Sequence, residues 1–154
     1  MKPGVYTQLY VQLVFAVKHR DRMLNDSIRK ELFSYMSGTL TNLKHKSIII
    51  NGISDHVHVF LGLNPSISIS DTVWELKRSS SLFINNKKWF QSKFQWQEGY
   101  GSFSYSKSQI DNVYKYIENQ EQHHKRVTFK EEYIDFLEKF EIEYDSKYLF
   151  DFFN

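Results

Sequence analysis

Two kinds of hydrophobic spacing alternate along the chain and predict its secondary structure. Runs rich in β-branched and aromatic residues are typical of strands. Apolar residues that recur every three or four positions behind a capping residue are typical of helices. The predicted elements, in chain order, are strand 5–18, helix 26–43, strands 47–53 and 56–62, helix 71–85, strand 97–104, and helices 109–124 and 128–140.

This order, β-α-β-β-α-β with helices added at the end, predicts an α+β fold of the ferredoxin-like type. The sheet is expected to be antiparallel, with two helices on one face. On the second helix the expected buried side chains are Val73, Trp74, Leu76, Leu82 and Phe83. The other face of the sheet needs a later helix or a ligand to cover it.

The 154 residues suit one domain, 1–154, because no linker, repeat or low-complexity tract divides them. The chain has no cysteine, which excludes disulfides and zinc–thiolate sites. No charged and apolar leader and no apolar run of about 20 residues is visible, so we expect a cytoplasmic protein.

Charge is distributed unevenly along the chain. Residues 1–93 carry a net +7 and residues 94–154 a net −5. A basic first part suits a surface that binds a polyanion, covered at one edge by an acidic segment. A chance distribution of charge is the alternative.

Two histidines on the third strand are candidate metal ligands. Because side chains alternate along a strand, His56, His58 and Phe60 share one face, while Val57 and Val59 share the other. At about 3.3 Å per residue, the two histidine Cα atoms lie roughly 7 Å apart, close enough for both rings to bind one ion. A pair of half-exposed histidines is the alternative, and a metal would need a third ligand.

The helix predicted over 109–124 can supply that ligand. Its apolar stripe is flanked by Tyr116 and Gln120, an i, i+4 pair that stands together on one border. Glutamine offers an oxygen ligand, and tyrosine offers a nucleophile that can store a phosphodiester bond as phosphotyrosine. Two alternatives remain: Tyr116 is a packing group, or Tyr114, paired with Glu118 on the opposite flank, is the functional tyrosine.

With these residues in place, the chain resembles the HUH single-tyrosine transposases of the IS200/IS605 type, small enzymes that move insertion sequences as single-stranded DNA. The two motifs that carry the resemblance are His56-Val57-His58 and Tyr116-Ile117-Glu118-Asn119-Gln120. Arg78 departs from the family pattern, which has a small residue there. Further segments match in the same order: Tyr10 to Lys18, Ile69-Ser70, Leu76-Lys77, Ser79-Ser80 and Trp96 to Tyr100.

The resemblance implies a reaction and a set of roles. His56, His58 and Gln120 would hold a divalent metal ion, with Mg²⁺ or Mn²⁺ expected. Tyr116 would attack a phosphate of single-stranded DNA, giving a 5′-phosphotyrosine and a free 3′-hydroxyl, and rejoining would reverse the step. The family also implies hairpin-ended DNA as partner and a homodimer in which the tyrosine helix can serve the partner's histidines.

Basic residues are the candidates for DNA contact, since cations neutralise phosphates. We expect Lys77 and Arg78 to contact DNA, followed by the corner that contains Lys18, Arg20 and Arg22. The pair His123-His124, next to Lys125-Arg126, either touches phosphate or ends its helix favourably. Asp55 either orients an imidazole or forms a turn.

Two other functions fit the same residues. One is a non-catalytic, domesticated protein that binds single strands or hairpins. The other is a rolling-circle or relaxase-type nuclease, which uses similar chemistry; the short chain disfavours it.

Overall fold

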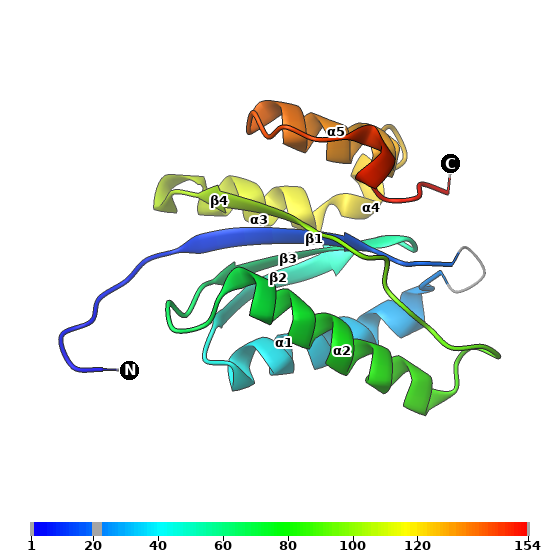
Figure 1. Cartoon of the computed structure of the whole chain (residues 1–154), viewed down its shortest axis with the longest axis horizontal. Helices are drawn as coiled ribbons and strands as arrows, with labels where there is room; N and C mark the ends of the chain where they lie inside the picture. Colours follow the sequence, from blue (N-terminus) through cyan, green and yellow to red (C-terminus); the bar gives the residue numbers. More distant parts are fainter. Residues whose placement is uncertain (1, 20–22, 154) are drawn as a thin grey trace.

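A four-stranded antiparallel sheet forms the centre of the computed structural model, which describes residues 2–19 and 23–153 (Figure 1). The strand order is β2-β3-β1-β4, so the two central strands are not consecutive in the chain. This arrangement confirms the predicted α+β fold. The strands are β1 (Tyr10–Ala16), β2 (Lys46–Gly52), β3 (His56–Gly62) and β4 (Gly101–Tyr105).

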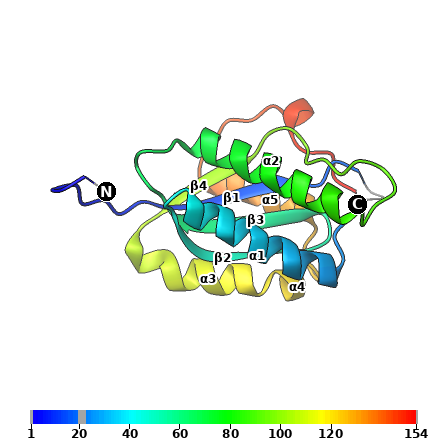
Figure 2. The ribbon, with the colours of Figure 1, turned by 90° about the horizontal axis from the view of Figure 1, so that it is seen from below.

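Two helices cover one face of the sheet, α1 (Asp26–Asn42) and α2 (Ile69–Lys87) (Figure 2). The side chain of Asn25 accepts a hydrogen bond from the Ile28 amide and starts α1 as predicted. Helix α2 begins two residues before the predicted start at residue 71, because the Ser68 side chain accepts the capping hydrogen bond from the Asp71 amide.

Two of the side chains expected to be buried on α2 are exposed. Trp74 is 63% exposed and Leu82 is 52% exposed, so this prediction was wrong for both. The stripe of α2 that faces the sheet is narrow, with Val73, Leu76 and Ile84 buried along it. Trp74 lies one residue outside that stripe and packs instead beneath the Arg78 guanidinium. The guanidinium carbon of Arg78 lies 5.4 Å from the centre of the Trp74 ring.

The opposite face of the sheet is covered by the last third of the chain (Figure 1). Helix α3 (Ile110–Glu118) and the short α4 (Gln120–His123) pack against β2. Helix α5 (Phe129–Lys139) lies over them and the sheet. Short 3-10 turns, η2 (Lys107–Gln109) and η3 (Ser146–Tyr148), complete this layer. The face that carries His56 and His58 is therefore buried.

The helix predicted over 109–124 is interrupted at Asn119. The side-chain amide of Asn51, on β2, donates hydrogen bonds to the carbonyls of Ile117 at 2.9 Å and Glu118 at 3.1 Å. These bonds satisfy carbonyls that a continuing helix would use, so α3 ends at Glu118 and α4 begins at Gln120.

The first strand is shorter than the predicted 5–18. Tyr10 is the first paired residue of β1, and its partners, Gly62 and Tyr105, are the last residues of β3 and β4. Residues 2–9 therefore pair with no strand of the described chain. The Leu9 carbonyl still accepts a hydrogen bond from the Leu63 amide at 2.7 Å, and the segment before it extends away from the sheet (Figure 1).

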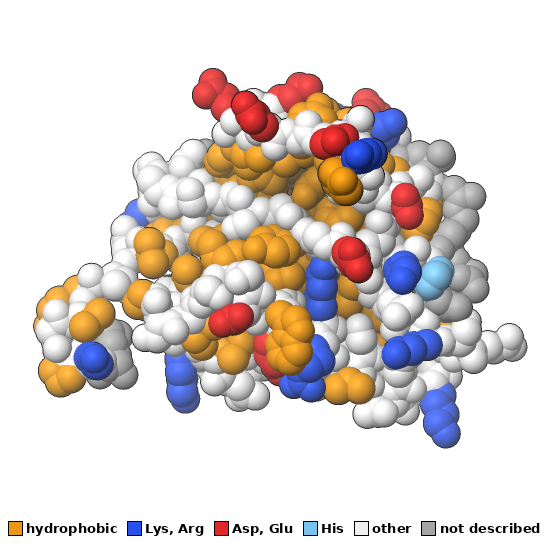
Figure 3. Space-filling model, in the orientation of Figure 1, with side chains coloured by type: hydrophobic (Ala, Val, Ile, Leu, Met, Phe, Trp, Pro, Cys, Tyr) orange, Lys and Arg blue, Asp and Glu red, His pale blue; other side chains and the backbone are white. Residues whose placement is uncertain are grey.

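Charge follows the layers. Acidic side chains gather over α5, while Lys and Arg lie mainly over the other half of the molecule (Figure 3). Among the described residues, no helix combines the length and apolar character needed to cross a bilayer.

A substitution at Gly52, the last residue of β2, tests how closely the backbone packs where β2 turns into the histidine strand β3. An added Cβ at Gly52 would lie 2.2 Å from the His56 carbonyl oxygen and 2.9 Å from Val57 Cα. We expect Gly52→Ala to lower the free energy of unfolding by about 1–3 kcal/mol, because backbone must shift. Gly38, in α1, has open space around it, so Gly38→Ala should raise that free energy by about 0.5–1 kcal/mol. Urea denaturation of both variants checks this, and equal effects would contradict it.

Candidate active site

The site is built on the buried face of β3. His56 and His58 are both fully buried and point toward α5, because residues two apart on a strand share a face. Their ring centres lie 5.0 Å apart. Phe129, the first residue of α5, stacks flat on the His56 ring at 3.8 Å and closes the site from that side.

Each of these imidazoles is held through its Nδ1 atom. His56 Nδ1 lies 2.8 Å from an Asp55 carboxylate oxygen, and His58 Nδ1 lies 2.6 Å from Oε1, the side-chain amide oxygen, of Gln12. Both partners are acceptors, so Nδ1 carries the hydrogen in each ring. The Nε2 atoms are then turned inward, which is the arrangement that metal-binding histidines use.

A third imidazole, that of His124, joins the pair from the end of α4. Its Nδ1 atom lies 2.8 Å from the Val127 carbonyl oxygen, which fixes the same tautomer. Its Nε2 atom faces the same interior point as those of His56 and His58. The ring is nearly buried, with a side-chain exposure of 5%.

The three Nε2 atoms converge on one carboxylate oxygen. Oε1 of Glu132, on α5, lies 3.2 Å from His56 Nε2, 3.0 Å from His58 Nε2 and 3.2 Å from His124 Nε2. The Glu132 side chain is 2% exposed. A buried carboxylate is stable only when charged or hydrogen-bonding groups surround it, and this cluster supplies them.

The other oxygen of Glu132 binds the two predicted residues of the tyrosine motif. The Tyr116 hydroxyl donates a hydrogen bond to Glu132 Oε2, and Gln120 Nε2 donates to the same atom at 2.9 Å. The amide oxygen of Gln120 faces His56 Nε2 at 3.3 Å. The structure thus brings His56, His58, Tyr116 and Gln120 together within one chain.

In the cluster the Glu132 carboxylate is negatively charged and the His56 ring beside it is positively charged. Burial by itself lowers the pKa of His56, but hydrogen bonds to Asp55 and Glu132 outweigh it and raise that pKa to about 9. Burial lowers the pKa of His58. Burial by itself raises the pKa of Glu132, but the histidines around it hold that pKa well below its usual range.

The Tyr116 phenol is held in its protonated form. Burial, followed by the negative charge of Glu132 and the hydrogen bond to it, raises the pKa of Tyr116 far above its ordinary value. Ionisation would place a second negative charge beside Glu132. The phenol therefore needs added positive charge nearby before it can become a strong nucleophile.

The donor set fits a divalent metal ion. Each of His56, His58, His124 and Glu132 offers one ligand atom, and these atoms all lie within 4.8 Å of one another. Three neutral imidazoles and a carboxylate suit Mn²⁺ or a later first-row ion better than Mg²⁺, which prefers oxygen ligands. The amide oxygen of Gln120 lies at the edge of the same cluster.

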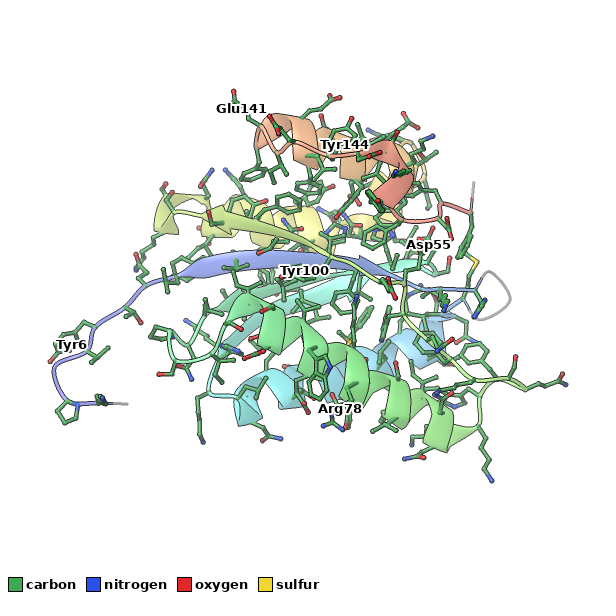
Figure 4. The ribbon with its side chains drawn as sticks, in the orientation of Figure 1. Tyr6, Asp55, Arg78, Tyr100, Glu141 and Tyr144 are labelled. Carbon is green, nitrogen blue, oxygen red and sulfur yellow. The ribbon has the colours of Figure 1, made fainter. Side chains whose placement is uncertain are left out.

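The residues predicted to contact DNA lie elsewhere. Lys77 donates hydrogen bonds to the carbonyls of Gln97 at 2.8 Å and Gly99 at 2.7 Å, and so links α2 to the segment before β4. Arg78 pairs with Glu75 on the face of the sheet opposite α5 (Figure 4). Lys18 is exposed beyond the end of β1, and Arg20 and Arg22 lie outside the described residues. None of the described three reaches the histidine cluster.

Two residues of the site were missed as ligands from the sequence. His124 was considered for phosphate contact or as a helix end, and Glu132 was not singled out. A signal for Glu132 was present, since it falls in the apolar stripe of α5 with Phe129, Tyr133 and Leu137. An acidic residue inside such a stripe must be paired when the helix docks.

Comparison with known proteins adds a family match. A family profile described as "Transposase IS200 like" matches residues 5–120, about three quarters of the chain and a range that includes Tyr116 and Gln120. His124 and Glu132 lie beyond the matched range. A comparison with curated protein sequences gives no significant match.

Solved structures of similar fold include the following two. One is of a protein from Deinococcus radiodurans R1 assigned as a transposase, with 26% identity and a TM-score of 0.58, covering 78% of this chain and 96% of that chain. The other is a REP-associated tyrosine transposase bound to a REP hairpin, with 13% identity and a TM-score of 0.56, covering 82% of this chain and 75% of that chain. The second similarity concerns the fold alone.

The ion pair in the site predicts a pH dependence for the metal-free protein. Because the pKa of His56 is raised from 6.5 to about 9, its stabilising effect is complete below pH 6.5 and is lost as the pH rises through about 9. Glu132→Gln keeps the shape but removes one source of that shift. With EDTA present, Tm should fall more steeply between pH 6.5 and 9 in the wild type than in the variant. Parallel curves would show that Glu132 does not stabilise the His56 imidazolium.

Proposed function

The chain belongs to the family of IS200-like transposases, which implies a DNA-cleaving enzyme, and we propose that it cleaves and rejoins single-stranded DNA at insertion-sequence ends. The intermediate would be a 5′-phosphotyrosine at Tyr116. One observation carries this proposal. The Tyr116 hydroxyl and three inward-facing imidazole nitrogens meet on the same buried carboxylate, that of Glu132.

The proposed step transfers a phosphoryl group to the phenol. The Tyr116 oxygen forms a bond to phosphorus while the bond from phosphorus to the 3′-oxygen breaks. Oε2 of Glu132, which already accepts the phenol hydrogen bond, is placed to receive the phenol proton. The departing 3′-oxygen takes up a proton from water and becomes a hydroxyl. Rejoining runs the same bonds in reverse, with a 3′-hydroxyl as the nucleophile.

The ligands we propose for a divalent ion are His56, His58 and Gln120, joined by His124 and Glu132. A bound cation supplies positive charge that lowers the cost of a phenoxide and of the charge that develops on phosphate. The three imidazoles are each fixed through Nδ1, so Nε2 is the atom that each ring would offer to an ion once His56 has lost its Nε2 proton. This donor set favours Mn²⁺ over Mg²⁺ among the two ions expected from the sequence.

The tyrosine and the histidines belong to the same chain in this structure, and the ring centres of His58 and Tyr116 lie 6.1 Å apart. The arrangement supports cleavage in cis. A homodimer, implied by the resemblance, remains part of the proposal and would allow the same helix to serve a partner. The similar transposase bound to a REP hairpin supports structured single strands as the substrate class.

A tyrosine substitution tests the nucleophile. Tyr116→Phe should abolish covalent protein–DNA adducts, since no hydroxyl remains to attack phosphorus, while the fold persists. The matched control is Tyr114→Phe, which changes a 38% exposed tyrosine two residues away and should leave adduct yield unchanged. Labelled single strands that carry candidate element ends, resolved on denaturing gels, measure the yield.

Normal adduct yield from Tyr116→Phe would refute Tyr116 as the nucleophile. If the wild type binds the labelled strands but forms no adduct with any strand tested, the non-catalytic hairpin-binding alternative would be favoured.

Metal addition tests the ligand set independently of cleavage. Mn²⁺ at 100 times its Kd should stabilise the EDTA-treated wild type by about 2.7 kcal/mol, seen as a rise in Tm. His58→Ala removes one imidazole and should reduce that rise strongly. The control is His45→Asn, at a buried histidine bound to Thr72, which should lower the starting Tm but keep the rise. An undiminished rise in His58→Ala would remove His58 from the ligand set.

A further inference from the structure

A surface cleft of about 400 Å³ opens beside Tyr116, on the outer side of α3 and α4. Tyr116 forms part of its wall. From there the wall continues through Lys115 on α3 and Asn119 at the helix break to His123, the last residue of α4, and Arg126 in the turn that follows. The cleft therefore connects the proposed nucleophile with solvent.

The lining of the cleft is cationic and rich in carboxamides. Lys115 and Arg126 supply two positive charges, and among the described residues no carboxylate lies within 4.0 Å of either cation. Asn112, Asn119 and Gln122 supply amide donors and acceptors, and no aspartate or glutamate of the described chain contributes to the wall. This combination suits a phosphodiester backbone with exposed bases.

The position of these residues follows from the helix repeat. Asn112, Lys115 and Asn119 are three and four residues apart, so they form one exposed row that runs along α3 to its C-cap, Asn119. Tyr116 borders that row and turns its hydroxyl inward. His123 Nε2 lies 3.2 Å from that hydroxyl, which places His123 between the cleft and Glu132.

The α5 side of the site is closed by aromatic side chains. The Phe136 ring centre lies 5.8 Å from that of Tyr116 and 6.1 Å from that of His58. Phe129 stacks on His56 at 3.8 Å. A strand that approaches Tyr116 from α5 must displace this packing, whereas one that approaches along α3 and α4 meets an open, positively charged surface.

We infer that this cleft binds the single strand that adjoins the phosphate attacked by Tyr116. Lys115 and Arg126 contact backbone phosphates on that strand, and the carboxamides of Asn112, Asn119 and Gln122 hydrogen-bond to its sugars or base edges. The inference rests on the proposed function for the reaction at Tyr116, and it adds a strand-binding site on α3 and α4 that lies outside the histidine cluster.

The experiment compares two double variants with the same change in charge. Lys115→Gln/Arg126→Gln removes both cations of the cleft. Lys130→Gln/Lys139→Gln removes two exposed cations of α5 and is the control. The binding of a fluorescein-labelled oligothymidine to each full-length protein is measured by anisotropy over a series of salt concentrations.

The cleft variant should bind about tenfold or more weakly at low salt, and the slope of log K against log salt should become shallower by about 1.4, or 0.7 for each lost phosphate contact. The control should keep the wild-type slope. Equal slopes in all three proteins would overturn the inference. The result is separable from the proposed function: a cleft variant with a shallower slope supports the strand site even if the wild type forms no tyrosine adduct.

Discussion

Three imidazole rings that share one buried carboxylate oxygen are the interaction on which the site depends. Burying a carboxylate costs several kcal/mol unless charge or hydrogen bonds replace its water. Glu132 gains that replacement from β3, from α4 and from the tyrosine helix α3 at once. The same contacts therefore fix where α5 docks. The fold of the last third of the chain and the geometry of the site have one cause.

This arrangement also sets the protonation state of the proposed nucleophile, Tyr116. The carboxylate that positions the Tyr116 hydroxyl is the same group that raises the pKa of Tyr116, after burial. Glu132 both orients the Tyr116 hydroxyl and disfavours its ionisation. The reactivity of the phenol therefore depends on a positive charge that neutralises the Glu132 carboxylate. In the metal-free protein that charge is shared with His56, whose pKa is raised by the same contact. Positive charge added near the Nε2 atoms would neutralise the Glu132 carboxylate and, by the same interaction, lower the pKa of Tyr116.

The sequence predicted the parts of the site that follow from local periodicity. Strand alternation correctly placed His56 and His58 on one face. Helical spacing placed Tyr116 and Gln120 on one border of the predicted helix, and both reach Glu132 although the helix breaks between them at Asn119. Glu132 could not be placed in this way, because its partners come from elements far away in the chain. The break at Asn119 has the same origin, since it depends on Asn51 of a strand nearly seventy residues earlier. Lys77 illustrates the converse: a cation that looks available in the sequence is engaged by two carbonyls of the folded chain.

The position of charge on the folded molecule bears on how a polyanion could reach the site. The uneven charge along the sequence becomes, in the folded molecule, an acidic outer side of α5 and a mainly basic opposite half (Figure 3). Acidic side chains lie on the outside of α5 and repel a phosphate backbone from that direction (Figure 3). The row formed by α3 carries Lys115 toward solvent, and Arg126 follows it in the turn after α4. Aromatic packing closes the α5 side by shape, and the charges disfavour the same route, so the two constraints are independent and both direct a strand to the α3 side of Tyr116.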